Sequence, residues 1–363
     1  MQTSEYETPV LLLDVDKAER NIRLMGEYFS SKKAVLRPHV KVHKSPWLAK
    51  RQVDAGARGI TCAKVSEAEV MVDGGIDDIL IANEIIGEDK VKRLAKLANR
   101  CKLAVIVDSA ENARQISSVA AGEGSRLRII VDVNLSSAVD GILDRTGVRP
   151  GNDVISLAQE VSRLPNLELG GVFGYEGSLG SFESPAAKVE GAKKAMGLLV
   201  EMADKIRAAG LNADTVSCGG TMSYRTAAEY PGVTEVQAGS YLFMDVAYRR
   251  SGIDFETSLT LLTRVVSTPR PGKAIVDSGF KAISADAGLP EVRGRPDLEM
   301  VSLNAEHGHM LVRDASRSPK RGERLELLPT HADTTTCLHD RYVLTHDGEI
   351  VDVLEIAARG KLE

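Results

Sequence analysis

Residues 103–134 read LAVIVDSAENARQISSVAAGEGSRLRIIVDVN and place a helical pattern between two apolar runs. The runs at 103–108 and 127–134 are rich in β-branched residues and have the length of buried strands. Between them, at 110–122, apolar residues recur every three or four positions, which is typical of an amphipathic helix. The stretch therefore predicts a strand, a helix and a second strand with short connections, the unit from which parallel sheets are built.

The alternation continues on both sides of this unit. Helical patterns also occupy residues 64–74, 88–100 and 186–209. The strand candidates are 34–38, 59–63, 78–83, 103–108, 127–134, 169–174, 215–218 and 233–238. Strands that alternate with helices in this number, over roughly 220 residues, predict an α/β fold of the (β/α)8 TIM-barrel type. The alternative is an open doubly wound sheet, which normally has fewer strands and often a GxGxxG turn that this sequence lacks.

A different pattern begins after about Arg250. Strand-like runs then follow one another without helices between them, at 258–268, 273–277, 299–303, 310–313, 324–328, 342–345 and 350–354. We therefore expect a second, mostly antiparallel β domain over residues 251–363, after a barrel over residues 11–250. The strand-like residues 9–14 fit either domain, and residues 1–10 could join the β domain. The Pro- and Gly-rich residues 288–296 predict a long loop.

Composition and charge narrow the classes of function. The chain has 363 residues, and 46 Lys and Arg against 51 Asp and Glu give a net charge of −5. This balance gives no reason to expect a nucleic-acid or membrane partner. Four cysteines without a CxxC pair, and a polar, acidic N-terminus, favour a cytoplasmic protein with reduced thiols. Histidines occur only at positions 39, 43, 307, 309, 331, 339 and 346, so imidazole chemistry must come from the two ends of the chain.

A group of basic side chains follows the first barrel strand. In RPHVKVHK at 37–44, strand alternation would place His39, Lys41 and His43 on one face. Barrel chemistry takes place at the C-terminal ends of the strands, where a lysine among other cations can act as a nucleophile or form a Schiff base. A solvated basic loop explains the same residues equally well.

Two loops of small residues follow the last two barrel strands, SCGGT at 217–221 and QAGSY at 237–241. Backbone N–H groups can approach an anion there, and this is the usual phosphate position in such barrels. Either loop alone is more often a tight turn, but the two together favour phosphate.

Near the C-terminus, PTHAD at 329–333 sets an imidazole and a carboxylate two residues apart. In extended backbone His331 and Asp333 share a face and could bind Zn²⁺ or Mn²⁺, with water or substrate completing the ligand set. Alone, such a pair is more often a surface hydrogen bond.

A lysine, phosphate loops and a metal pair together indicate pyridoxal phosphate. Further motifs have a characteristic order. The full series is RPHVKVHKS at 37–45, KVSEAE at 64–69, RTGV at 145–148, YEG at 175–177, GGT at 219–221, GSYLFMD at 239–245, VDSGFK at 276–281, EHG at 306–308 and PTHAD at 329–333. With these motifs the chain resembles, over nearly its full length, the D-threonine aldolase and D-serine dehydratase family. These fold-type III pyridoxal phosphate enzymes share a barrel domain with alanine racemase.

The resemblance implies a role for each matching residue. Lys41 is the catalytic lysine that forms the Schiff base, Arg145 faces the pyridine nitrogen, and Tyr175 lies beside the cofactor. The remaining cofactor-binding residues are Gly220, Thr221, Gly239, Ser240 and Tyr241. His331 and Asp333 are the ligands of a divalent metal, which could be Mn²⁺, Mg²⁺ or Zn²⁺. The resemblance also implies a homodimer.

Two departures from the family pattern concern the reaction. Residues 134–144 form a longer link than usual, and Ser181 stands where the family's aldolases usually have a histidine. His331-x-Asp333 favours the aldolases, because the dehydratases more often have His-x-Cys. The resemblance thus implies metal-assisted retro-aldol cleavage of a D-3-hydroxy-α-amino acid to glycine and an aldehyde. A metal-bound hydroxide, Glu176 or His307 would then take the proton of the substrate hydroxyl.

Three alternatives stay open. The first is a dehydratase that converts D-serine or 3-hydroxy-D-aspartate to a keto acid and ammonia. The second is a racemase or epimerase. The third, from a different class, is a carrier or regulator that holds pyridoxal phosphate without turnover. The candidate metal pair in a second domain argues against this third alternative.

Overall fold

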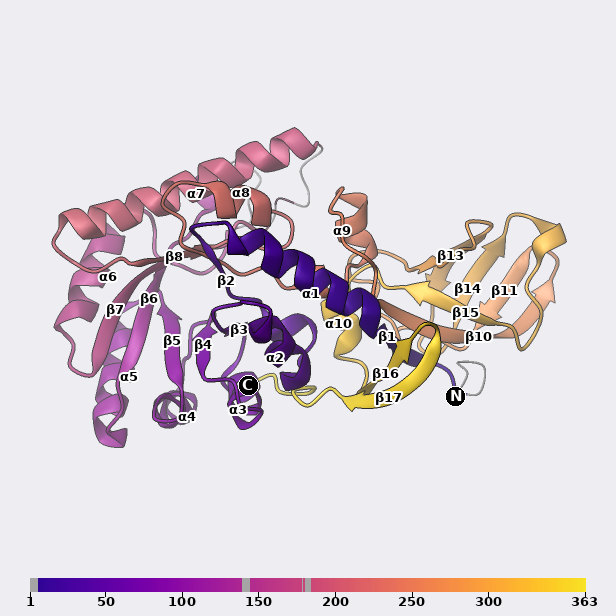
Figure 1. Cartoon of the computed structure of the whole chain (residues 1–363), viewed down its shortest axis with the longest axis horizontal. Helices are drawn as coiled ribbons and strands as arrows, with labels where there is room; N and C mark the ends of the chain where they lie inside the picture. The colour runs from indigo at the N-terminus through magenta and orange to yellow at the C-terminus, as the bar shows by residue number, and fades with distance from the viewer. Residues whose placement is uncertain (1–5, 139–143, 178, 180–183) are drawn as a thin grey trace. The chain divides into compact units, whose positions relative to one another are not determined.

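The computed structural model describes residues 6–138, 144–177, 179 and 184–363 (Figure 1). Its contacts divide the chain into two compact units. The barrel unit consists of Leu24–Lys41, Ser45–Gly239 and Lys361–Glu363, and the β unit of Met1–Arg23, Val42–Lys44 and Ser240–Gly360. The division into domains at 11–250 and 251–363 stays a prediction.

The barrel unit contains an eight-stranded sheet in the order β2-β9-β8-β7-β6-β5-β4-β3, and every neighbouring pair in it is parallel. Its strands are β2 (Val35–Leu36), β3 (Ile60–Cys62), β4 (Asp78–Ile81), β5 (Lys102–Val107), β6 (Leu127–Asp132), β7 (Leu167–Phe173), β8 (Thr215–Cys218) and β9 (Glu235–Val236). A parallel bridge between His39 and Thr61 joins the continuation of β2 to β3 and closes the ring. The predicted α/β barrel is therefore confirmed.

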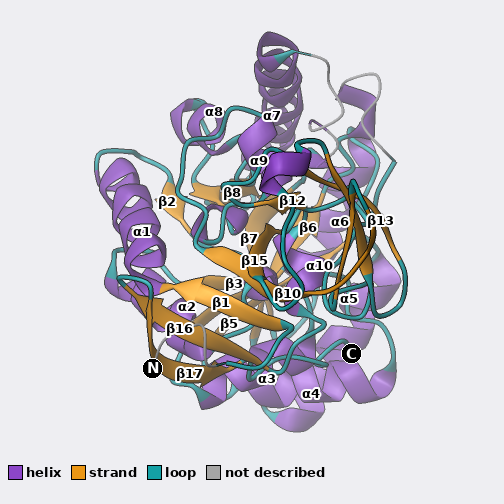
Figure 2. Ribbon diagram, turned by 90° about the vertical axis from the view of Figure 1, so that its right-hand side faces the viewer, coloured by secondary structure: helices purple, strands orange, loops and turns teal. Residues whose placement is uncertain are grey.

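Helices cover the outside of these strands. They are α2 (Pro46–Asp54), α3 (Val65–Asp73), α4 (Glu88–Ala98), α5 (Ala110–Glu123), α6 (Asn152–Arg163), α7 (Pro185–Ala208) and α8 (Tyr224–Glu229). Figure 2 shows α3, α4 and α5 along the edge of the view, outside the strands β3 and β5 that they contact. Helix α1 (Val15–Ser30) precedes the first barrel strand. Each helix buries an apolar stripe, so the alternation read from the sequence reflects burial on one side of every helix.

The unit β5-α5-β6 shows how the sequence sets these boundaries. Ser109 lies in extended backbone before α5, and its hydroxyl accepts a hydrogen bond from the N–H of Asn112 at 3.2 Å. Gly124 ends the helix in the left-handed conformation, with a φ of 63°. Ala113, Ile116 and Ala120 form the buried face of the helix. The capping residues Ser109 and Gly124 therefore bound the same helix that the spacing of the apolar residues predicts.

Large apolar side chains fill the interior of the barrel. Leu80, Ile106, Ile130 and Phe173 form a buried cluster, and the partly buried Tyr175 packs against it. These residues come from β4, β5, β6 and β7, so the cluster ties four neighbouring strands together. The cluster also supports the ring of Tyr175, which follows β7, by packing against it.

The β unit contains a nine-stranded, mostly antiparallel sheet, as predicted. Its strands are β1 (Val10–Asp14), β10 (Leu259–Arg270), β11 (Lys273–Val276), β12 (Glu291–Val292), β13 (Leu298–Leu303), β14 (Gly308–Val312), β15 (Arg324–Leu328), β16 (Arg341–His346) and β17 (Glu349–Glu355). Strand β1 pairs with β10 and β16, which places the strand-like residues 9–14 in this sheet. The stretch 288–296 is not only a loop, because β12 within it pairs with β15.

Short helices occur in both units. Helices α9 (Val246–Arg250) and α10 (Ala332–Thr336) belong to the β unit. Among the described residues, 3-10 helices include η2 (Val40–Val42), η3 (Ser136–Ala138), η5 (Ser240–Leu242) and η6 (Ala315–Arg317). Within the described residues, no helix has both the length and the apolar character that crossing a membrane requires.

Candidate active site

Lys41 follows β2 and lies in the 3-10 helix η2, with its side chain exposed. Its backbone N–H donates to Nδ1 of His39 at 3.4 Å. His43, by contrast, is fully buried, and its carbonyl accepts from the hydroxyl of Tyr342 at 2.9 Å. The prediction that His39, Lys41 and His43 share one face is therefore wrong. The chain turns into a 3-10 helix with three residues per turn, so alternate residues no longer point the same way.

Arg145 and Tyr175, which lie 30 positions apart in the sequence, come together after β6 and β7. The guanidinium carbon of Arg145 is 5.2 Å from the centre of the Tyr175 ring. The amide of Asn134 donates to the carbonyl oxygen of Arg145 at 2.7 Å and fixes the backbone there. An exposed cation and an aromatic ring thus stand side by side in the segments that follow β6 and β7, and their roles toward the cofactor stay predictions.

Asp132, at the end of β6, is hydrogen-bonded to the segment that carries Arg145. The hydroxyl of Thr146, next to Arg145, donates to Oδ2 of Asp132 at 2.9 Å. Burial, and then the neighbouring Glu84 carboxyl, raise the pKa of Asp132 to about 8. Sequence reasoning missed Asp132 and Glu84 because their partners are distant in the chain.

The buried Asp132 carboxyl predicts a loss of stability as the pH rises. Its pKa is raised from an ordinary value of 3.8 to about 8, so between these pH values the folded chain binds more protons than the unfolded chain. The free energy of unfolding should therefore fall across this window, by at most about 1.4 kcal/mol per pH unit. Asp132→Asn keeps an acceptor for Thr146 and should remove this part of the fall. Urea unfolding of both proteins at the two ends of the window measures the difference, and equal falls would contradict the assignment.

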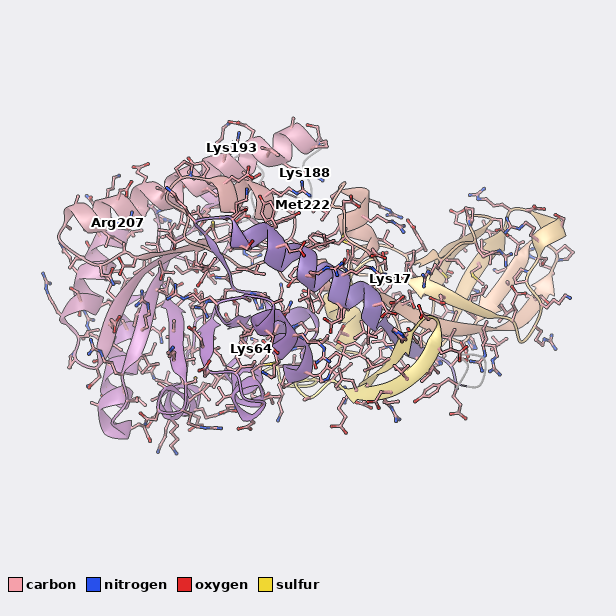
Figure 3. All side chains as sticks on the ribbon, in the orientation of Figure 1. Lys17, Lys64, Lys188, Lys193, Arg207 and Met222 are labelled. Atoms are coloured by element: carbon pink, nitrogen blue, oxygen red, sulfur yellow. The ribbon has the colours of Figure 1, made fainter. Side chains whose placement is uncertain are left out.

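The loop after β8 forms a small, tightly folded turn beside Tyr175. Gly219 has a φ of +79°, which favours glycine. A Cβ added to Gly220 would lie 3.4 Å from Cε2 of Tyr175, at van der Waals contact, so the loop backbone lies close against the ring. Thr221 is almost fully buried, and Met222 follows it (labelled in Figure 3). This is a cradle of the kind that brings backbone N–H groups close to an anion.

Glu176 lies behind this loop and was considered from the sequence as a base. Its carboxylate is 2% exposed and accepts hydrogen bonds from the Gly219 N–H at 3.3 Å and from the Ser223 hydroxyl. Burial raises its pKa. Both oxygens are engaged by the loop, so Glu176 is not presented to a substrate. Ser223, three residues after Gly220, has the spacing of a side chain that accepts a hydrogen bond from the turn, but nothing in the sequence links it to Glu176.

The loop after β9 leads out of the barrel unit. The N–H of Gln237 donates to the carbonyl of Cys218 at 3.2 Å, which keeps the β8 and β9 ends together. Gly239 is the last residue of this segment in the barrel unit, and Ser240 begins η5 in the β unit. Tyr241 is fully buried and packs with its ring centre 5.6 Å from that of Phe255. The cofactor-binding roles of these residues stay predictions.

In the β unit, His331 and Asp333 lie together at the start of α10. Nε2 of His331 is 3.9 Å from Oδ2 of Asp333, and Nδ1 is 2.7 Å from Oδ2 of Asp286. Asp245 accepts a hydrogen bond from the N–H of Ala332 at 3.0 Å and anchors the segment. A metal-binding histidine commonly donates from its other nitrogen to a carboxylate, which is the position of Asp286 here. The sequence did not identify Asp286.

The donor set fits a divalent metal with two protein ligands. An imidazole nitrogen and a carboxylate oxygen suit Zn²⁺ or Mn²⁺. Among the residues that the structure describes, no three or more His, Cys, Asp or Glu side chains gather as a metal site. Water or substrate would therefore supply the remaining ligands. His307, the other side chain considered as a base, is exposed in the turn between β13 and β14. Ser181, at the position where the family's aldolases usually have a histidine, lies outside the described residues.

Comparison with known proteins matches both parts of the chain. Residues 13–247 match the family described as alanine racemase, N-terminal domain, and residues 258–345 match the putative serine dehydratase domain. The chain is 38% identical over 361 residues to the D-threonine aldolase of Arthrobacter sp, covering 98% of this chain and 94% of that protein. It is also 38% identical to the 3-hydroxy-D-aspartate aldolase of Paracoccus denitrificans (strain Pd 1222), covering 99% and 94%.

A solved structure shows the same relationship in three dimensions. The crystal structure of D-threonine aldolase from Filomicrobium marinum matches with a TM-score of 0.95 and 33% identity, over 100% of this chain and 98% of that chain. The alanine racemase-like, fold-type III architecture implies pyridoxal phosphate as cofactor. The resemblance predicted from the motifs is confirmed: the chain is an enzyme of the lyase class and belongs to the D-threonine aldolase and D-serine dehydratase family.

Proposed function

We propose that this protein cleaves D-3-hydroxy-α-amino acids, D-threonine among them, to glycine and an aldehyde, with pyridoxal phosphate and a divalent metal. The observation that carries the proposal is the pair His331 and Asp333, oriented by Asp286 at 2.7 Å. The aldolase names of the relatives support it, because the similarity to both covers nearly the whole chain. The net reaction breaks the Cα–Cβ bond, removes the hydroxyl proton and returns a proton to Cα.

Each candidate residue has a task in this reaction. When bound, pyridoxal phosphate supplies an electron sink for the α-carbon, and the metal supplies a Lewis acid for the β-hydroxyl. Lys41, exposed after β2, would attach to the cofactor through its Nζ. Arg145 would face the ring nitrogen and keep it unprotonated, because a guanidinium does not give up its proton. Nε2 of His331 and Oδ2 of Asp333 would hold the metal.

Product analysis tests the proposal directly. The protein is supplied with pyridoxal phosphate and Mn²⁺ and incubated separately with D-threonine and with D-serine. Cleavage predicts glycine and acetaldehyde in equal amounts from D-threonine, detected by chromatography and by an aldehyde-reducing coupling enzyme. Ammonia with 2-oxobutanoate, or with pyruvate from D-serine, would contradict cleavage, and so would a change at the α-carbon without bond breaking.

The second candidate function is β-elimination to a keto acid and ammonia. One observation favours it: residues 258–345, which include His331 and Asp333, match a domain described as a putative serine dehydratase. The metal pair could assist departure of the hydroxyl while Lys41 removes the α-proton. We also propose a homodimer, on the basis of the family resemblance, which sedimentation equilibrium would test.

A further inference from the structure

The buried carboxylate of Glu176 controls which N–H groups the loop after β8 can offer. It accepts the N–H of Gly219 at 3.3 Å and the hydroxyl of Ser223. The Ser223 oxygen in turn accepts the N–H of Gly220 at 3.1 Å. Two consecutive backbone donors at the tip of the loop are therefore directed toward protein groups, one by Glu176 itself and one through Ser223.

The same hydrogen bonds fix the shape of the turn. The N–H of Ser223 donates to the carbonyl of Gly220 at 3.1 Å, and the N–H of Ala227 donates to the carbonyl of Ser223 at 2.9 Å. Ser223 thus joins the loop to α8, and Glu176, after β7, holds Ser223 from behind. Because the glycines at 219 and 220 have no side chains to constrain them, these contacts define the loop conformation.

Other N–H groups near the turn remain available. In the part of the chain that the structure describes, the N–H groups of Met222 and Gly239 donate to no protein acceptor. Met222 follows β8 and Gly239 follows β9, and β8 and β9 are paired neighbours in the sheet. Backbone donors at the ends of adjacent strands are well suited to bind a phosphate from two sides.

We propose that Glu176 is the positioning residue of the phosphate site, an inference that rests on the proposed use of pyridoxal phosphate. It does not touch the phosphate, since two anionic groups in contact would repel each other. It acts through the loop: it holds Gly219 directly and Gly220 through Ser223. In the turn that results, the N–H of Met222 is free to donate to the phosphate. Ser223 is a second positioning residue, because it links Glu176 to the N–H of Gly220.

The test compares two ligands that differ only in the phosphate. Apoprotein is titrated with pyridoxal phosphate and with pyridoxal, and the dissociation constants are measured from the ligand absorbance. In Glu176→Gln the side chain has one acceptor oxygen instead of two, so either the Gly219 N–H or the Ser223 hydroxyl hydrogen loses its acceptor. The dissociation constant for pyridoxal phosphate should rise about tenfold or more, and that for pyridoxal should change less than about twofold. Ser223→Ala should give a smaller rise with the same selectivity for the phosphate.

Equal losses for both ligands, or tighter binding of pyridoxal phosphate by Glu176→Gln, would overturn the role of Glu176 and leave the cofactor assignment intact. Wild-type protein that binds pyridoxal phosphate no better than pyridoxal would overturn the phosphate site itself. Hydrogen–deuterium exchange of the apoprotein gives a readout without cofactor. The Gly219 N–H group should exchange faster in Glu176→Gln and the Gly220 N–H group in Ser223→Ala, and unchanged protection would contradict the inference even if activity fell.

Discussion

Lys41→Ala should abolish the absorption band of pyridoxal phosphate attached to the protein and lower the rate of D-threonine cleavage by roughly 10³-fold or more. The physical reason is that an alanine side chain cannot form the covalent link that holds the cofactor aldehyde. Pyridoxal phosphate should still bind through its phosphate, because the backbone N–H groups of the loops after β8 and β9 are kept in this variant. Spectra of the dialysed protein and single-turnover kinetics measure both effects.

Lys50→Ala is the matched control for this change. Lys50 is an exposed lysine on α2, nine residues after Lys41, and it pairs with Asp54 at 3.2 Å. Removing an exposed pair of this kind changes the free energy of unfolding by less than about 1 kcal/mol. Its spectrum and activity should match the wild type. Persistence of the band in Lys41→Ala would show that another lysine holds the cofactor.

The barrel could be predicted from the sequence because its information is local and repeated. Each strand is a short apolar run, and each helix has its own periodicity and, in α5, its own capping residue Ser109. If one strand or helix is predicted wrongly, the prediction of the other strands and helices is unaffected. The antiparallel sheet was predicted for the same reason, while β12 was missed because it has only two residues, in a stretch rich in Gly and Pro.

The candidate site was only partly predictable because its support is not local. Glu176 and Ser223 are 47 positions apart, and His331 and Asp286 are 45 apart. Without the fold, nothing in the sequence says that these side chains meet. The segment after β2 was wrongly interpreted for a different reason. Its alternation of basic and apolar residues imitates a strand, but sheet pairing ends at the bridge between His39 and Thr61, and the chain then turns.

His331→Ala should remove the bound metal and lower the cleavage rate by roughly 10²-fold or more, with little change in the binding of pyridoxal phosphate. With only two protein ligands, the metal is bound weakly once one of them is lost. A Lewis acid contributes several kcal/mol to the stabilisation of the transition state in such a reaction. Metal content by mass spectrometry after gel filtration, and cofactor absorbance on the same sample, separate the two effects. Chelation of the wild type should reproduce the loss, and added Mn²⁺ should restore activity only in the wild type.

The chain contains a close control in His346→Ala. Nδ1 of His346 lies 2.7 Å from Oδ1 of Asp16, and Nε2 lies 3.6 Å from Oδ2 of Asp347, so the same residue types are arranged in nearly the same way. His346 is 57% exposed on its side chain, against 32% for His331. This variant should keep its metal and its activity. Asp286→Asn should fall between the two, with a roughly 10- to 100-fold loss of metal affinity, because it alters only the group that orients His331. Equal metal content in His331→Ala and His346→Ala would mean that the metal is bound elsewhere.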